Sequence, residues 1–198
     1  MPDPQAARML AQKLALRDRL LTTRRRRSLL ESGAAARAIA GHLLAAPEVR
    51  RAASVAAYVS LPGEPGTGVL LDALLATGRR VLLPVLLPDG DLDWAAYAGE
   101  GSLRPAGRGM LEPDGPRLGV DAVAGADVVL VPGLAVSHDG LRLGQGAGCY
   151  DRALARVPIG TFTCVLLHDD EVGVDVPAEP HDRRVRAAAT PSGLIPLG

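Results

Sequence analysis

Short apolar runs alternate with helical patterns and with turns rich in glycine and proline, and this alternation limits the fold more than any other feature. Ser54–Leu61 (SVAAYVSL) is an apolar run of β type, the turn-forming stretch PGEPGTG follows it, and Val69–Ala76 has a helical pattern. A second apolar run, Val81–Leu87, comes after Gly78. A strand, a helix and a second strand in this order are typical of a βαβ unit with parallel strands.

Three further apolar runs extend the predicted sheet. Asp127–Pro132 (DVVLVP) is the clearest candidate for a buried strand, Thr161–Leu167 is another, and Val185–Thr190 is a weaker one. A helix is predicted between the first two, at about Tyr150–Arg156. The predicted fold class is therefore α/β: an open, mostly parallel, Rossmann-like three-layer αβα sandwich with an N-terminal helical segment.

The N-terminal segment, residues 5–46, is rich in alanine, leucine and arginine, which favours helix. Gly33 is expected to be the main interruption of this helical segment, and Pro47 is expected to end it. No internal repeat is visible, and a length of 198 residues favours one domain. We therefore predict a single α/β domain over residues 1–198.

Residues 88–126 interrupt the regular alternation. They are rich in glycine, proline and aspartate, so we expect a surface excursion from the sheet, with a lid as one option. Two weak strands are predicted within it, near Leu92–Tyr97 and Leu103–Pro105.

The composition argues against several classes of function. The 22 basic residues balance the 22 acidic ones, so no overall field draws the protein to nucleic acid or to a membrane surface. Cys149 and Cys164 show no metal-ligand spacing and favour a reducing compartment, although one disulfide stays open. The first ten residues contain no apolar signal core, and no apolar run reaches transmembrane length. We predict a cytoplasmic monomer that binds neither nucleic acid nor membrane.

A glycine-rich motif, Gly140–Asp151 (GLRLGQGAGCYD), is the strongest local signal. Open parallel sheets bind ligands at the carboxyl ends of their strands, which here are loops 62–68, 84–91, 133–148 and 168–182. The motif's alternating glycines precede a helix start, where unpaired N–H groups favour anions. Arg142 and a magnesium ion on Asp151 could contact the same phosphates. The alternative is an ordinary glycine-rich loop, because the pattern matches neither the Walker A motif nor the G-x-G-x-x-G motif.

A basic stripe is the second signal. Lys13, which is the one lysine in the chain, is separated from Arg17 and Arg24 by spacings that place all three on one helix face. Like charges at such spacings destabilise a helix unless a shared polyanion binds them. The alternative is a solvated basic face, with Lys13 exposed. The run Arg24–Arg27 lacks interleaved aromatic residues, which argues against nucleic-acid binding.

Isolated polar residues add weaker hypotheses. Glu64, in the loop after the first strand, could accept hydrogen bonds from a polar heterocycle, or it could be a solvated turn residue. Asp182 is a second candidate magnesium ligand, and His181 is expected to be a surface histidine. Nucleophilic-hydrolase and zinc motifs are absent from the sequence.

In the order of these motifs, the chain resembles the 5-formyltetrahydrofolate cyclo-ligase family, also called methenyltetrahydrofolate synthetases. The central glycine motif is long and specific, and the lone lysine falls on the family's nucleotide-binding lysine. The matching segments are Lys13–Arg17 (KLALR), Tyr58–Thr67, Glu112-Pro113, Val131–Ala135 (VPGLA), Gly140–Asp151 and Pro177–Asp182.

The resemblance implies an ATP- and magnesium-dependent conversion of 5-formyltetrahydrofolate to 5,10-methenyltetrahydrofolate. ADP and phosphate would be released through a phosphorylated formyl oxygen, with no side-chain nucleophile. The residues implied to bind ATP are Lys13, Arg17, Arg142, Leu143, Gly144, Gln145, Gly146, Ala147, Gly148, Cys149 and Tyr150. The implied folate-binding residues are Val59, Glu64 and Tyr150, and the implied Mg²⁺ ligands are Asp151 and Asp182.

The chain also departs from the family pattern. Gln145 and Cys149 stand where the family commonly has aromatic residues, and Ala147 replaces a usual glycine. Val136-Ser137 replaces an aromatic-Asp pair, and Arg186 replaces an acidic residue. Two other functions therefore stay open: a non-catalytic regulator that binds folate or nucleotide, and an ATP-independent enzyme similar to sugar-phosphate isomerases or CoA-transferases.

Overall fold

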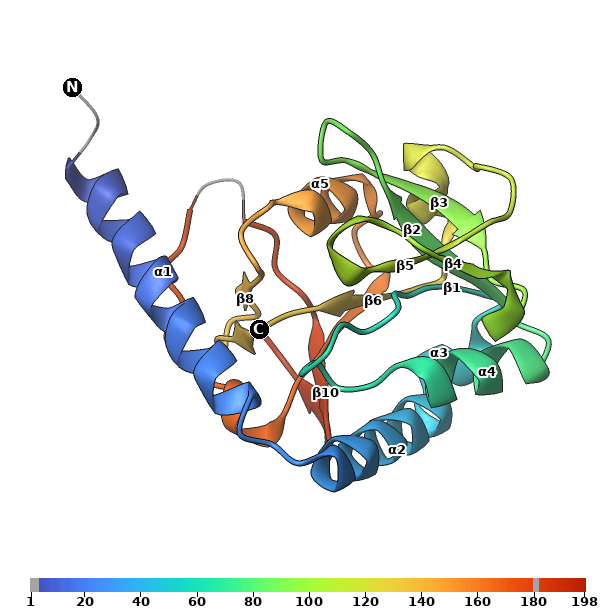
Figure 1. Cartoon of the computed structure of the whole chain (residues 1–198), viewed down its shortest axis with the longest axis horizontal. Coiled ribbons are helices and arrows are strands. Elements are labelled where there is room, and N and C mark those ends of the chain that lie inside the picture. Colours follow the sequence, from blue (N-terminus) through green and yellow to red (C-terminus); the bar gives the residue numbers. More distant parts are fainter. Residues whose placement is uncertain (1–3, 180–181) are drawn as a thin grey trace.

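In the computed structural model, which describes residues 4–179 and 182–198, the centre of the molecule is a seven-stranded sheet (Figure 1). Its strands are β1 (Ser54–Ala56), β2 (Arg80–Leu86), β3 (Leu92–Ala96), β6 (Val128–Pro132), β9 (Phe162–Leu166), β10 (Ala187–Thr190) and β11 (Gly193–Pro196). They lie in the order β11-β10-β9-β6-β1-β2-β3. Neighbours from β10 to β2 are parallel, whereas the edge strands β3 and β11 are antiparallel to theirs. The predicted open, mostly parallel sheet is thus confirmed.

Helices cover both faces of this sheet, as the sequence predicts for a three-layer sandwich. One face carries α2 (Leu29–Ala45), α3 (Pro47–Arg51) and α4 (Gly68–Ala76), and the other carries η3 (Val120–Gly125) and α5 (Cys149–Arg156). In β6, Val128 and Leu130 join the first core, whereas Val129 and Val131 join the second. The strand is apolar at successive positions because both of its faces are buried.

The helical prediction for residues 5–46 is correct, but the predicted interruption is wrong. The first helix, α1 (Pro4–Arg24), ends before Ser28, and Gly33 lies inside α2. Ser28 and Glu31 form a capping box: each side chain accepts a hydrogen bond from the other residue's backbone N–H, at 3.2 and 2.7 Å. This cap stabilises the start of α2, and its stabilising effect outweighs the destabilising effect of one glycine inside the helix. Pro47 follows the end of α2 and begins α3.

Residues 88–126 are only partly a surface excursion. The strands predicted near Leu92–Tyr97 and Leu103–Pro105 are confirmed as β3 and β4 (Leu103–Pro105), but β3 belongs to the main sheet and its Trp94 is buried. The prediction of a surface location is therefore wrong for β3. Next to it, β4 and β5 (Leu111–Pro113) form a hairpin, flanked by the short turns η1 (Glu100–Ser102) and η2 (Gly107–Gly109). The edge strand β11 has no counterpart in the sequence prediction.

A buried ion pair attaches α1 to the rest of the molecule. Arg24 donates to both carboxylate oxygens of Glu171, in the turn η4 (Asp169–Glu171), at 2.8 Å each, and to the carbonyl oxygen of Gly133 at 2.6 Å. Leu20 packs beside this pair on the apolar cluster around β7 (Ala135–Val136) and β8 (Arg142–Leu143). As a result α1 lies across the segment that follows β6 (Figure 1).

Within the described ranges, no helix is both long enough and apolar enough to span a bilayer. The two cysteines, Cys149 and Cys164, are both free thiols, so the disulfide that the sequence left open is not formed.

The ion pair leads to a stability prediction. Glu171→Gln leaves the Arg24 charge buried without its counter-charge and should lower the free energy of unfolding by about 3–5 kcal/mol. Urea unfolding followed by circular dichroism measures this loss. Asp170→Asn is the matched control, because it removes the exposed partner of Arg27 in the same turn and should cost far less. Equal losses in the two variants would contradict the importance of the buried pair.

Candidate active site

A cavity of about 320 Å³ opens at the carboxyl ends of β1, β2 and β6. The four loops that the sequence analysis singled out all contribute to its lining, through Glu64, Pro84, Gly133 and Asp182 among others. This is the position expected of a ligand site in an open parallel sheet. Pro180 and His181, which belong to the last of these loops, lie outside the described residues.

The glycine-rich segment Gly144–Gly148 forms one wall of the cavity and leads into α5. Gly146 has φ +103°, and a side chain there would meet the guanidinium carbon of Arg17 at 3.3 Å. A side chain on Gly144 would meet Nη1 of Arg142 at 2.6 Å. The backbone conformation of Gly146 therefore favours glycine, and a side chain at either position would displace the guanidinium of a neighbouring arginine.

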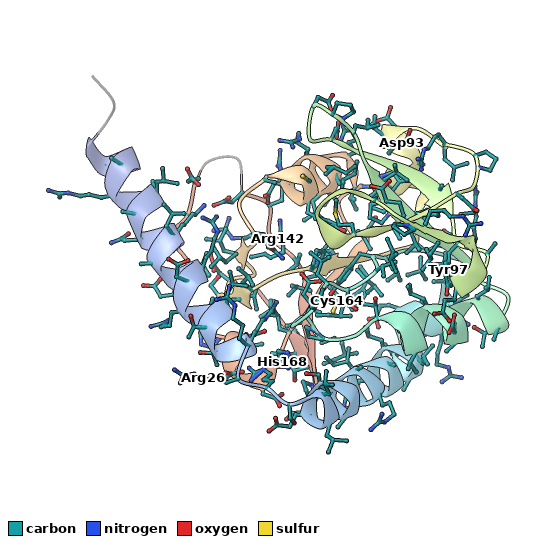
Figure 2. The ribbon with its side chains drawn as sticks, viewed as in Figure 1. Arg26, Asp93, Tyr97, Arg142, Cys164 and His168 are labelled. Carbon is teal, nitrogen blue, oxygen red and sulfur yellow. The ribbon has the colours of Figure 1, made fainter. Side chains whose placement is uncertain are left out.

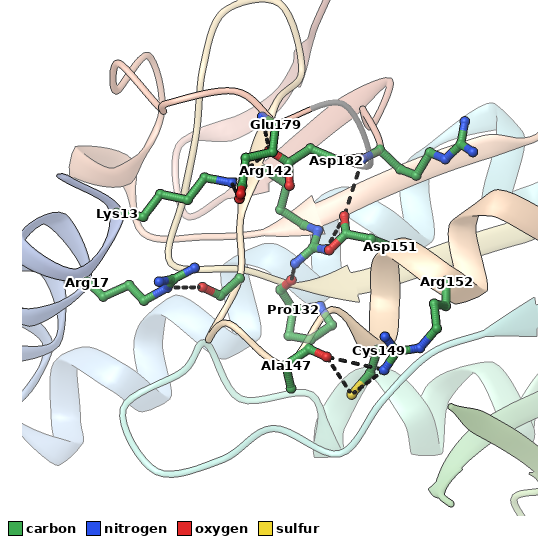
Figure 3. A network of polar contacts seen from close by, with 12 residues as sticks. Lys13, Arg17, Pro132, Arg142, Ala147, Cys149, Asp151, Arg152, Glu179 and Asp182 are labelled. Atoms are coloured by element: carbon green, nitrogen blue, oxygen red, sulfur yellow. Dashed lines mark hydrogen bonds and ion pairs between the residues drawn. The ribbon is translucent and has the colours of Figure 1, made fainter. Parts of the chain in front are cut away.

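Two arginines hold this segment in place (Figure 3). Nε of Arg17 donates to the carbonyl oxygen of Gly144 at 2.9 Å. Arg142 is buried and donates to the carbonyl oxygen of Pro132 at 3.3 Å and to Oδ1 of Asp151 at 3.1 Å. Its guanidinium lies 5.9 Å from the ring centroid of Tyr150. Both arginines thus border the cavity at the glycine-rich wall.

Lys13 is not on an exposed face, so that expectation is wrong. The side chain is 5% exposed, and Nζ donates to Oε2 of Glu179 at 2.6 Å and to Oδ2 of Asp182 at 2.8 Å (Figure 3). The basic stripe faces inward because acidic residues from distant segments meet it. The third member of the stripe, Arg24, is neutralised by Glu171 and does not line the cavity.

The rest of the arginine run is divided between an ion pair and solvent. Arg27 pairs with Asp170, whereas Arg25 and Arg26 are exposed. Figure 2 shows Arg26 directed away from the molecule, in contrast to Arg142 in its interior. The run therefore does not present four free cations on one surface.

Glu64 is buried, so the alternative of a solvated turn residue is wrong. Its Oε2 accepts a hydrogen bond from the backbone N–H of Leu61 at 2.9 Å, and its Oε1 accepts one from Gln145 Nε2 at 3.3 Å. Burial raises the pKa of the Glu64 carboxyl above its ordinary value. Burial likewise raises the pKa of the neighbouring Tyr58 and Tyr150 hydroxyls, with the Glu64 charge as the next cause. This end of the cavity is therefore lined by a buried carboxyl beside two tyrosine side chains.

The remaining implied ligand-binding residues divide between the cavity and the core. Val59, Ala147, Cys149 and Tyr150 line the cavity. Leu143 does not belong with them: its side chain is buried in the apolar cluster under α1. Leu143 does not line the cavity, and its carbonyl oxygen accepts a hydrogen bond from the N–H of Leu134.

Asp151 and Asp182 both line the cavity, and each is paired with a cation. The described hydrogen bonds to Asp151, from Arg142 and from the backbone N–H of Arg183, both use Oδ1. Among residues 4–179 and 182–198, no group of three histidine, cysteine or acidic side chains could enclose a metal ion. Mg²⁺ is commonly held by one or two carboxylates together with substrate phosphates, so the two aspartates fit a shared site of that kind.

The sequence analysis missed one residue that lines the cavity, Glu179, and one that supports its wall without lining it, Arg152. Glu179 lies three positions before Asp182 and contacts Lys13, and nothing in its local sequence marks it. Arg152 donates to the carbonyl oxygens of Ala147, at 3.2 Å, and Gly90, which ties the glycine-rich wall to the β2–β3 turn. Its place in the first turn of a predicted helix beside the glycine motif was the available signal.

Comparison with known proteins identifies related chains. Residues 9–191 match the profile of the 5-formyltetrahydrofolate cyclo-ligase family. A 5-formyltetrahydrofolate cyclo-ligase of Mycolicibacterium smegmatis is 43% identical over 150 residues, covering 73% of this chain and 77% of the relative. One of Escherichia coli is 32% identical over 161 residues, with coverages of 77% and 86%. The structure of 5,10-methenyltetrahydrofolate synthetase from Aquifex aeolicus has a TM-score of 0.79 at 26% identity, with coverages of 93% and 92%.

The buried carboxyl leads to a prediction about pH. At pH values below the ordinary carboxyl pKa, Glu64 is protonated in the folded and unfolded chains, and Glu64→Gln should resemble the parent. As pH rises through the raised pKa, the folded parent must bury a charge and loses stability that the variant keeps. The stability advantage of the variant should therefore grow as pH rises from about 4 until it passes the raised pKa of Glu64, and then stay constant.

Urea unfolding at a series of pH values measures this difference. The exposed Glu100→Gln is the control and should show no such trend. A difference between Glu64→Gln and the parent that stays constant with pH would contradict the effect of burial.

Proposed function

The chain belongs to the 5-formyltetrahydrofolate cyclo-ligase family and is a ligase, and we propose that it converts 5-formyltetrahydrofolate to 5,10-methenyltetrahydrofolate with ATP and Mg²⁺. One observation carries the proposal. A single cavity joins a glycine-rich wall with Arg17 and Arg142 to an end lined by the buried Glu64 and by Tyr58 and Tyr150. The first end suits phosphates, and the second suits a polar heterocycle.

The reaction must activate a poor electrophile. In the proposed first step, the formyl oxygen attacks the γ-phosphorus of ATP, and ADP leaves. The neighbouring ring-closing nitrogen then attacks the activated carbon and loses its proton, and the C–O bond breaks as inorganic phosphate leaves. Neither step needs a side-chain nucleophile, so the protein contributes positioning and neutralisation of charge.

The proposed ATP phosphates lie along the glycine-rich wall. Lys13, Arg17 and Arg142 supply the positive charge, and the backbone of Gly144–Gly148 allows close approach. The first turn of α5 adds N–H groups that no residue of the helix itself can satisfy. Gln145, Ala147, Cys149 and Tyr150 contact the ligand from the same wall in this proposal, whereas Leu143 does not line the cavity.

The proposed Mg²⁺ ligands are Asp151 and Asp182, which border the same cavity as the arginines. When bound, Mg²⁺ would neutralise charge on the phosphates. Asp151 also has a role of its own, since its Oδ1 orients the Arg142 guanidinium.

At the other end of the cavity, Glu64, Val59 and Tyr150 are proposed to bind the reduced folate. The Glu64 carboxyl is held in place by the Leu61 N–H and by Gln145. Gln145 stands at a position where the family commonly has an aromatic residue, so its amide replaces a stacking surface with a hydrogen bond to Glu64. We further propose that residues 1–198 act as one catalytic domain, as a cytoplasmic monomer without nucleic-acid or membrane partners.

The first prediction of this proposal is turnover. Purified protein with 5-formyltetrahydrofolate, ATP and Mg²⁺ should form the methenyl chromophore, followed by absorbance, with one phosphate released per product. Omission of ATP should abolish the reaction, which an ATP-independent isomerase or transferase would not require. Folded protein that binds folate or nucleotide without forming product would support the regulator instead.

The second prediction concerns Asp151. Asp151→Asn keeps an acceptor for Arg142 but removes the counter-charge of a buried guanidinium, so the free energy of unfolding should fall, by up to about 3–5 kcal/mol, and turnover is compared on protein shown by circular dichroism to be folded. Turnover should fall by about 100-fold or more, with a higher Mg²⁺ requirement. Asp91→Asn is the control, because Asp91 pairs with Arg156 outside the cavity. Normal turnover and a normal Mg²⁺ requirement in Asp151→Asn would sink the metal assignment.

A further inference from the structure

The ammonium group of Lys13 is already occupied by protein carboxylates. Nζ lies 2.6 Å from Oε2 of Glu179 and 2.8 Å from Oδ2 of Asp182. These are the lengths of charge-assisted hydrogen bonds, which a phosphate oxygen would also form. Two of the three ammonium donors are thus used, and Lys13 does not itself line the cavity, whereas Glu179 and Asp182 do. A nucleotide in the cavity therefore reaches Lys13 only where one of these two carboxylates gives way.

The charges at this end of the cavity are balanced. Arg17, Arg142, Asp151, Glu179 and Asp182 line this end, and Lys13, which does not line it, supplies the third cation through its pairs with Glu179 and Asp182. A balanced cluster has little attraction for a triphosphate, which carries several negative charges. Binding is favourable only if carboxylate charge is removed from the cluster or neutralised.

The two partners of Lys13 are not held equally well. The Asp182 side chain is 8% exposed, and its Oδ2 also accepts a hydrogen bond from the backbone N–H of Glu179 at 2.7 Å. The Glu179 side chain is 31% exposed, and among the described residues its carboxylate has Lys13 as its partner. Glu179 also lines the cavity, so it can turn towards solvent at lower cost than Asp182.

Resting on the ATP site proposed above, we propose that Glu179 is an internal competitor of the nucleotide, with its carboxylate occupying the contact with Lys13 that a phosphate oxygen takes. The competition keeps the buried lysine neutralised when no nucleotide is bound, since an isolated buried charge is costly. It also lowers the affinity for nucleotide, because each binding event must first break the Lys13–Glu179 pair. Glu179 thereby becomes a residue that sets affinity without contacting the reacting atoms.

A double-mutant cycle tests this role through binding rather than turnover. Calorimetry would measure the Kd of the non-hydrolysable analogue adenosine 5′-(β,γ-methylene)triphosphate with Mg²⁺ for the parent, Glu179→Gln, Lys13→Ala and the double variant. Glu179→Gln should tighten binding by about fivefold in the parent. It should change nothing in the Lys13→Ala background, because the competition acts through Lys13.

Asp175→Asn is the matched control, because it removes one negative charge from an exposed position of the same segment and should leave the Kd unchanged. If Lys13→Ala does not fold, Lys13→Met replaces it in the cycle, since methionine keeps the length of the side chain but cannot donate to Glu179.

Three results would overturn the proposal. Weaker binding with a higher Mg²⁺ requirement in Glu179→Gln would make Glu179 a metal ligand. If Glu179→Gln tightens binding equally in the parent and in the Lys13→Ala background, Glu179 acts through long-range charge and not through Lys13. If the parent does not bind the analogue at all, both the proposed ATP site and the competitor role of Glu179 are wrong. If the parent binds the analogue but Glu179→Gln weakens binding, only the competitor role is wrong.

Discussion

The buried ion pair between Arg24 and Glu171 is the contact on which the polar half of the cavity depends. It attaches the end of α1 to the turn after β9 and to the carbonyl oxygen of Gly133 at the end of β6. Lys13 and Arg17 belong to the same helix, so their positions at the cavity follow from this attachment. An ion pair without solvent is strong only when both partners are kept, which makes the position of α1 sensitive to either residue.

The sheet explains why the other half of the cavity lies where it does. The carboxyl ends of β1, β2 and β6 are adjacent because these strands are parallel neighbours. The loops that leave them must therefore meet, and they bring Glu64, Pro84 and Gly133 to one opening. The glycine-rich wall then closes the opening, since its missing side chains leave room for Arg17 and Arg142.

The two ends of the cavity differ in whether their carboxylates are paired with cations. Around the glycine-rich wall each buried or half-buried carboxylate faces a cation, as in the pairs of Lys13 with Asp182 and of Arg142 with Asp151. At the other end Glu64 has hydrogen-bond donors but no direct cation, and burial raises its pKa. A triphosphate and a polar heterocycle that bind together in this cavity would each meet one of these two environments.

Local sequence determined the elements of this protein, and tertiary structure decided the partners of its charged residues. The apolar alternation of residues 54–87 predicts the two strands and the helix between them, although the first strand ends at Ala56 and not at Leu61. The motif at Gly140–Asp151 predicts the helix start, although the short strand β8 lies within its predicted loop. Those signals depend on hydrogen bonds and side-chain spacing within a few residues. Even here Gly33 misled, because the capping box of Ser28 and Glu31 was the stronger local signal.

The burial of Lys13, Arg24 and Glu64 could not be predicted in the same way. Lys13 meets Asp182 across 169 residues of chain, and Arg24 meets Glu171 across 147. Whether a charged side chain is solvated depends on which distant segment packs over it, and local periodicity carries no information about that. The sequence by itself therefore determined the α/β elements, the glycine-rich loop and the set of charged residues available for a site. Only the tertiary structure decided which of those charges are paired, because pairing requires the sheet and α1 to be in place.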